Sequence, residues 1–143
     1  MKKDASVILL ADDDVDDAEM FTSIWEEVDP AATVLTFSTG ALIIEHLAKA
    51  NQRQPDVIFL DINMPEMNGW QCLKAIKSNP RVKHIPVIMY STSSHQRDKE
   101  LAAELGAIAF VTKPSDYKTL RETLRAISIN LNGDLANAIR RLL

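Results

Sequence analysis

Short apolar runs alternate with amphipathic stretches along the whole chain. Five runs rich in β-branched residues have the pattern of buried strands and lie at residues 6–11, 33–38, 56–61, 86–91 and 107–112. After each run, apolar residues recur at helical spacing, in stretches that end near Pro30, Lys49, Pro80, Gly106 and Asn130. Regular alternation of strand and helix is typical of a parallel sheet with helices on both faces. The pattern therefore predicts one doubly wound α/β domain.

A tail over residues 131–143 follows the fifth strand–helix unit. Its apolar residues recur at helical spacing and are Leu131, Leu135, Ile139 and Leu142. We expect a short helix that packs on its own domain or across a dimer, next to the last strand and helix. The chain is accordingly divided into a domain over residues 5–130 and a tail that is too short for an effector domain.

Composition narrows the class of protein. The chain has 143 residues, of which 46% are apolar and 25% charged, the ordinary balance of a globular domain. No apolar run is long enough for a membrane span, and the single cysteine, Cys72, excludes an internal disulfide. The N-terminus lacks the apolar segment of a secretion signal, so a cytoplasmic protein is expected.

The net charge of −4 is concentrated near the N-terminus. Six of the 20 acidic residues lie between residues 12 and 19, which leaves 16 basic and 14 acidic groups elsewhere. That balance argues against direct nucleic-acid binding, because such binding depends on basic groups at phosphates. We assign Asp14, Asp16 and Asp17 to the start of the first helix, where negative charge is stabilising.

Polar residues collect at the ends of the predicted strands. They are Asp12 and Asp13 after the first strand, Asp61 at the third, Ser91 at the fourth and Lys113 after the fifth. The carboxyl ends of parallel strands share one edge of the sheet, which is where ligands bind in such folds. We therefore expect three carboxylates, a hydroxyl and an ammonium group to lie together.

This set of groups points to phosphoryl chemistry. Adjacent carboxylates repel one another unless a proton or a cation lies among them, and oxygen ligands without histidine or thiolate suit Mg²⁺. Once a metal ion neutralises the acids, the positive charge of Lys113 is not needed for them, so it favours the binding of an anion at the same site. A carboxylate can attack phosphorus to form an aspartyl phosphate, whose oxygens Mg²⁺, Lys113 and Ser91 would neutralise together.

Four short motifs, in this order, resemble the receiver domain of two-component response regulators. They are Asp12-Asp13, Asp-Ile-Asn-Met-Pro at 61–65, Ser91-Thr92 and Lys113-Pro114. The resemblance covers roughly residues 5–130 and is strongest to small stand-alone regulators, some of which partner phytochrome-type or multi-sensor kinases. It implies a flavodoxin-like, five-stranded parallel sheet with strand order 2-1-3-4-5 and helices on both faces.

The resemblance also implies a metal site and a phosphorylation site. Asp61 would be the phosphoacceptor, taking a phosphoryl group from a histidine kinase or a phosphotransfer protein. Mg²⁺ would be bound by Asp13, by Asp61 and by the backbone carbonyl of Asn63, with Asp12 acting partly through water. The protein would not be an enzyme, apart from self-phosphorylation from small donors and autodephosphorylation.

The remaining roles concern the switch and its output. Ser91 would bind the phosphoryl oxygen, Lys113 would pair with it, and Phe110 would occupy the aromatic switch position. A cis bond between Lys113 and Pro114 is expected from the tight turn and from the resemblance. Output would pass to a downstream protein partner, without direct contact with nucleic acid or membrane. A homodimer through the fourth helix, fifth strand and fifth helix is a further expectation.

Two alternatives remain beside this interpretation. An aspartate-nucleophile phosphatase of the haloacid-dehalogenase type uses similar residues, but it requires a second acid two residues after the nucleophile. Asn63 stands at that position and cannot exchange protons. A receiver-like module that binds partners without phosphorylation is the other alternative, and the complete set of acids, Ser91 and Lys113 argues against it.

Overall fold

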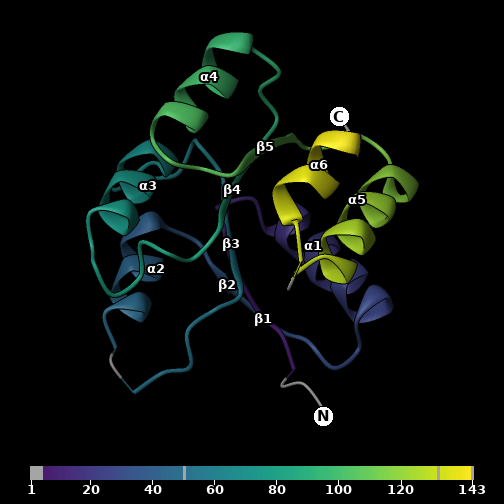
Figure 1. The fold of residues 1–143 in the computed structure, drawn as a ribbon, viewed down its shortest axis with the longest axis horizontal. Coiled ribbons are helices and arrows are strands. Elements are labelled where there is room, and N and C mark those ends of the chain that lie inside the picture. The colour runs from purple at the N-terminus through teal and green to yellow at the C-terminus, as the bar shows by residue number, and fades with distance from the viewer. Residues whose placement is uncertain (1–4, 50, 132, 143) are drawn as a thin grey trace.

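A five-stranded parallel sheet forms the centre of the molecule. The computed structural model describes residues 5–49, 51–131 and 133–142. The strands, in the order β2-β1-β3-β4-β5 across the sheet, are β1 (Val7–Ala11), β2 (Thr33–Phe37), β3 (Val57–Leu60), β4 (Val87–Ser91) and β5 (Ala109–Thr112) (Figure 1). Each predicted strand is present, with bounds shifted by at most two residues. The predicted fold class and strand order are confirmed.

Helices cover both faces of this sheet, in two layers. Their bounds are α1 (Val15–Val28), α2 (Gly40–Leu47), α3 (Gly69–Lys77), α4 (Gln96–Glu104), α5 (Tyr117–Ile129) and α6 (Leu135–Leu142). One layer contains α2, α3 and α4, and the other contains α1, α5 and α6 (Figure 1). None of the helices in the described ranges combines the length and the hydropathy needed to cross a membrane.

The three central strands are apolar up to the polar residues at their carboxyl ends, because helices cover them on both sides. Every residue of β3 and β4 is buried, as are four of the five residues of β1. The edge strand β2 has no fully buried residue. This difference explains why the central strands show continuous apolar runs rather than alternation.

Side-chain caps fix the points at which four helices begin. The carboxylates of Asp14 and Asp116, the hydroxyl of Thr39 and the amide oxygen of Asn68 each accept a hydrogen bond from a backbone N–H three residues on. At the other end of α4, Gly106 has a φ of 99°, the left-handed conformation that commonly ends a helix. The caps of α1 and α3 matter most for function, because both helices begin beside the ends of β1 and β3.

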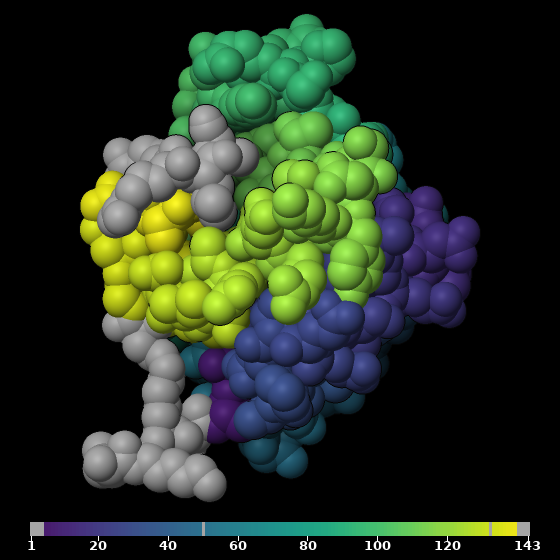
Figure 2. All heavy atoms as spheres, turned by 90° about the vertical axis from the view of Figure 1, so that its right-hand side faces the viewer, coloured from purple at the N-terminus to yellow at the C-terminus, as the bar shows by residue number. Residues whose placement is uncertain are grey.

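The C-terminal tail forms a helix that packs on its own domain. Helix α6 contacts α5 and β5, and its residues Leu135, Ala138 and Ile139 are buried. Figure 2 shows α6 on one side of α5 and α1 on the other side. Of the two arrangements expected for the tail, the structure therefore has packing on the same domain. The side chain of Leu142 lies outside the described part of the chain.

Candidate functional site

The carboxyl edge of the sheet brings together side chains that follow three strands, β1, β3 and β5. Backbone pairing continues one residue beyond the strands, because Asp12 donates its N–H to Phe37, Asp61 to Ala11 and Lys113 to Ser91, at N···O distances of 2.9, 2.9 and 2.7 Å. These bonds keep the chain extended as it leaves the sheet. The side chains that follow β1, β3 and β5 are therefore held on rigid backbone.

Three carboxylates form a cluster at this edge. One oxygen from each of Asp12, Asp13 and Asp61 lies within 4.8 Å of the others. Asp12 and Asp61 are buried, at 4% and 7% exposure, while Asp13 is exposed at the rim. The predicted fourth metal contact, Asn63, is an exposed residue in the connection between β3 and α3. An all-oxygen donor set that is open to water on one side fits a hard divalent cation such as Mg²⁺.

Lys113 extends into this cluster from the end of β5. Its Nζ lies 2.7 Å from Asp12 Oδ2, 2.9 Å from Asp17 Oδ2 and 3.5 Å from Asp61 Oδ2. Burial of the lysine opposes its charge, but hydrogen bonds to Asp12 and Asp17 outweigh that effect and raise the pKa of Lys113 above its ordinary value. The ammonium group is therefore charged and fixed among three carboxylates. One of them, Asp17, was not predicted to lie there.

That unexpected partner is Asp17. The sequence assigned it to the N-terminus of α1 with Asp14 and Asp16, and Asp14 does cap the helix. Asp17 instead pairs with Lys113, 96 residues away. One feature of the sequence could have indicated this contact. Asp17 lies in the first turn of the helix that follows Asp12 and Asp13, so its carboxylate is close to the carboxyl edge of the sheet.

The bond between Lys113 and Pro114 corrects one expectation. The described residues contain no cis peptide bond, so the prediction of a cis bond at this point is wrong. The expected direction of the lysine is nevertheless found. Because the Lys113 amide pairs with the Ser91 carbonyl, β5 is extended by one residue and directs the side chain toward the acids without a reversal at the proline.

The two predicted switch residues lie on neighbouring strands. Ser91 pairs with Thr112 in the β4–β5 register, and Met89 pairs with Phe110. Since side chains alternate along a strand, Ser91 and Phe110 face the same side of the sheet. Ser91 is buried at 1% exposure and Phe110 at 6%, the latter in the core beneath α2, α3 and α4.

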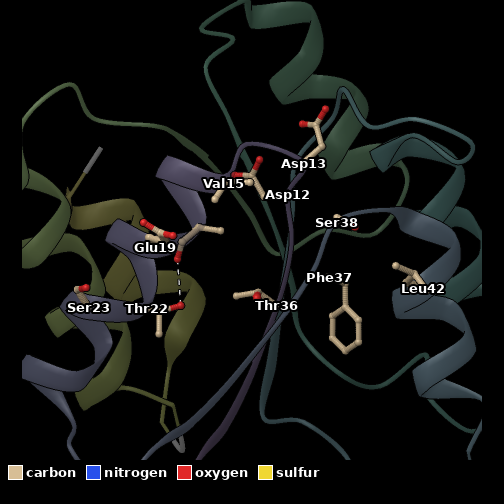
Figure 3. A pocket seen from close by; sticks show the side chains of 11 residues that line it. Asp12, Asp13, Val15, Glu19, Thr22, Ser23, Thr36, Phe37, Ser38 and Leu42 are labelled. Atoms are coloured by element: carbon tan, nitrogen blue, oxygen red, sulfur yellow. Dashed lines mark hydrogen bonds between the residues drawn. The ribbon is translucent and has the colours of Figure 1, made fainter.

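A groove of about 660 Å³ starts at the carboxylate cluster and runs between α1 and the edge strand β2. Figure 3 shows Asp12 and Asp13 at one end, with α1 on one side and Phe37, Ser38 and Leu42 on the other. The sequence pattern did not predict this groove. It reaches Asp12 and Asp13 of the cluster from the side of β2.

The carboxyl group of Asp61 is a weaker acid than an ordinary aspartate. Burial raises the pKa of Asp61 to about 6, Lys113 opposes that rise, and the nearby charge of Asp12 adds to it. The N–H of Ile62 donates to Asp61 Oδ1 at 2.8 Å and also favours the ionised form. Ionisation of Asp61 therefore costs more free energy in the folded protein than in the unfolded chain when no metal ion is bound.

We expect Asp61→Asn to stabilise the metal-free protein at neutral pH. The pKa is about 6 in the folded protein and 3.8 in the unfolded chain, so the folded state binds the proton more tightly. The resulting penalty is fully present above pH 6 and disappears as the pH falls through the unfolded value. Asp61→Asn should raise the free energy of unfolding by about 1–3 kcal/mol near neutral pH, and by much less near pH 4.

Denaturant unfolding in EDTA at several pH values measures this difference. Asp16→Asn is the control, because Asp16 is an exposed acid in the first turn of α1. That substitution should destabilise slightly, by up to about 1 kcal/mol, through the lost helix-dipole interaction. A gain for Asp61→Asn that does not change with pH would contradict the raised pKa.

Comparison with known proteins identifies the family to which the chain belongs. The response regulator receiver domain family matches residues 8–125. PilH of Pseudomonas aeruginosa is 32% identical over 120 residues, which cover 84% of this chain and 95% of PilH. A probable cyclic di-GMP phosphodiesterase of Vibrio cholerae is 41% identical over 83 residues, but these are 58% of this chain and only 18% of that protein.

Two solved structures have the same fold. The phosphorylated cyanobacterial phytochrome response regulator RcpA has a TM-score of 0.80 and 28% identity, covering 87% of this chain and 91% of RcpA. The Mn²⁺-bound form of the response regulator Rcp1 has a TM-score of 0.76 and 28% identity, covering 86% and 91%. The fold and the acidic edge therefore define a receiver domain. The chain belongs to the response regulator receiver domain family, and small single-domain response regulators are among its homologues.

Proposed function

We propose that the protein is a phosphoacceptor response regulator in which Asp61 takes a phosphoryl group from a histidine kinase or a phosphotransfer protein. The observation that carries this proposal is the position of the Lys113 ammonium. It is held 3.5 Å from Asp61 Oδ2, among buried carboxylates that it does not fully neutralise. A fixed cation beside a buried carboxylate is suited to receive the negative oxygens of a transferred phosphoryl group.

The chemistry requires few groups. A carboxylate oxygen of Asp61 attacks phosphorus, the bond between phosphorus and the donor nitrogen breaks, and the donor histidine takes up a proton as it leaves. Lys113 then pairs with one phosphoryl oxygen, and the Ser91 hydroxyl donates to another. Both groups lie at strand ends, so the backbone that carries them is already in place for the transfer.

Mg²⁺ is the cofactor that we propose for this step. The carboxylates of Asp12, Asp13 and Asp61 and the backbone carbonyl of Asn63 would hold it, and it would supply positive charge to the phosphoryl oxygens. The all-oxygen cluster supports this assignment, as does the Mn²⁺ bound by the similar protein Rcp1.

We further propose that phosphorylation is read by protein contacts rather than by catalysis. The Ser91 hydroxyl would move toward the phosphoryl group, and Phe110 would turn into the space that it leaves. This movement would change the face formed by α4, β5 and α5, where a downstream protein or a second copy of the chain would bind. Residues 5–130 would form the switching domain, with α6 packed against it.

Phosphorylation by a small donor tests the proposal. Incubation with acetyl phosphate and Mg²⁺ should add one phosphoryl mass to the wild type and to Asp16→Asn, and none to Asp61→Asn. EDTA should prevent the addition. Equal labelling of Asp61→Asn would contradict the assignment of the phosphoacceptor. A wild type that is never labelled would favour the receiver-like interaction module instead.

A further inference from the structure

The carboxylate of Asp17 lies outside the three-acid cluster but contacts its lysine. Its Oδ2 lies 2.9 Å from Lys113 Nζ, which is shorter than the 3.5 Å between that ammonium and the phosphoacceptor Asp61. The Asp17 side chain is 37% exposed, so it approaches the lysine from the solvent side. Lys113 is therefore fixed between a buried carboxylate, Asp12, and a half-exposed one, Asp17.

The backbone around Asp17 is well held. The N–H of Asp17 donates to Asp14 Oδ1 at 3.0 Å, and the N–H of Asp14 donates to Asp12 Oδ1 at 3.0 Å. These two bonds tie the first turn of α1 to the end of β1. The Asp17 carboxylate is thus presented to Lys113 from a fixed position.

An aromatic ring lies on a further side of the lysine. Lys113 Nζ is 5.4 Å from the ring centroid of Tyr90, a distance at which a cation and a ring attract each other. Phe21 and Phe59 pack against this ring with centroid distances of 5.7 and 6.1 Å. The ring therefore restricts the lysine side chain, and the two closest carboxylates determine where its ammonium rests.

Helix stabilisation alone does not account for this arrangement. Asp16 lies in the same helical turn, carries the same charge and is exposed, so it provides the same interaction with the helix dipole. Asp17 differs from Asp16 through its ion pair with a lysine 96 residues away. That contact links α1 to the end of β5.

We propose that Asp17 is a positioning residue for phosphoryl transfer, which holds the Lys113 ammonium beside Asp61 before the phosphoryl group arrives. The inference rests on the proposed function of Asp61 as phosphoacceptor. Without Asp17, the ammonium loses one of its two closest partners and must be ordered during the reaction. Preorganised charge is effective because that cost is met in folding rather than in the transition state.

The rate of phosphorylation at saturating acetyl phosphate tests this role. Asp17→Asn and Asp16→Asn each remove one negative charge near the entry of an anionic donor, and charge alone would make both variants equal to or faster than the wild type. Loss of positioning has the opposite sign. We expect Asp17→Asn to lower the saturating rate by on the order of 10-fold, with no rise in the half-saturating donor concentration.

A longer acidic side chain at position 17 tests whether the carboxylate itself is needed. Asp17→Glu keeps the carboxylate and should recover part of the rate, whereas Asp16→Asn should retain all of it. A saturating rate for Asp17→Asn within about twofold of that of Asp16→Asn would overturn the inference. If Asp61→Asn is unlabelled in the same assay, the proposed function survives that failure.

A second measurement does not depend on phosphorylation. In ¹⁵N NMR spectra of lysine ammonium groups, Lys113 should give a slowly exchanging signal in the wild type and in Asp16→Asn. That signal should be lost or broadened in Asp17→Asn. An unchanged Lys113 signal in Asp17→Asn would overturn the inference even if no donor labels the protein. Unfolding curves that match those of Asp16→Asn would show that both variants are folded.

Discussion

Gly69→Ala is expected to destabilise the protein by about 3 kcal/mol or more and to slow phosphorylation of Asp61. A Cβ atom at Gly69 would lie 2.1 Å from the carbonyl oxygen of Asp61 and 2.9 Å from Ile62 Cα. These are backbone atoms of the segment that carries the candidate phosphoacceptor, so they cannot yield as a flexible side chain would. The Gly69 N–H also donates to the Ile62 carbonyl, which ties the start of α3 to this segment.

Denaturant unfolding and the rate of labelling by acetyl phosphate measure the two effects. Gly133→Ala is the matched control, because the nearest atom to its added Cβ is the Asn130 carbonyl oxygen at 4.0 Å. The control should change stability by less than about 0.5 kcal/mol and leave labelling unchanged. A Gly69→Ala protein as stable as the control would show that the close approach of α3 to Asp61 is absent in solution.

Ile139→Ala should cost about 2–4 kcal/mol of stability. Ile139 is 1% exposed and belongs to the core between the sheet and the α1, α5 and α6 layer. Its truncation leaves a cavity beneath α6 in addition to the lost burial of apolar surface. A loss of this size would make α6 a structural part of the domain rather than an appended tail.

The same substitution at an exposed site provides the control. Ile129, at the end of α5, is 72% exposed, and Ile129→Ala should change stability by less than about 0.5 kcal/mol. Thermal or denaturant unfolding of both variants gives the comparison. Equal stabilities for the two variants would mean that α6 does not pack on the domain in solution.

The strand pattern predicted the fold because burial leaves a strong trace in this sequence. Strands β3 and β4 are covered on both sides and are largely apolar, so Asp61 directly after β3 and Ser91 at the end of β4 stand out as polar residues. The edge at which the polar groups collect followed from parallel topology alone. Those features depend on short-range pattern and on one general rule of sheet architecture.

Contacts between side chains that are far apart in the sequence could not be predicted from the pattern of apolar and polar residues. Asp17 and Lys113 are 96 residues apart, and nothing in either segment specifies their contact. The cis bond at Pro114, expected from a tight turn and from the family resemblance, was wrong, and the hydrogen bond from the Lys113 N–H to the Ser91 carbonyl, which directs the lysine instead, joins residues 22 positions apart. For α6, helical spacing predicted an apolar stripe, but the surface that it covers depends on how much of the sheet α5 leaves open.

The buried position of Cys72 has a practical consequence. Its thiol is fully covered in the layer between α2, α3 and the sheet, with Sγ 3.9 Å from the Gly40 carbonyl oxygen, and burial raises the pKa of Cys72 to about 12. A thiol in this state is a poor nucleophile toward alkylating reagents while the layer is closed. Site-directed fluorophores or spin labels can therefore be attached through cysteines introduced on the surface with the native thiol left in place. The rate at which Cys72 itself is alkylated then reports how often the α2–α3 layer opens.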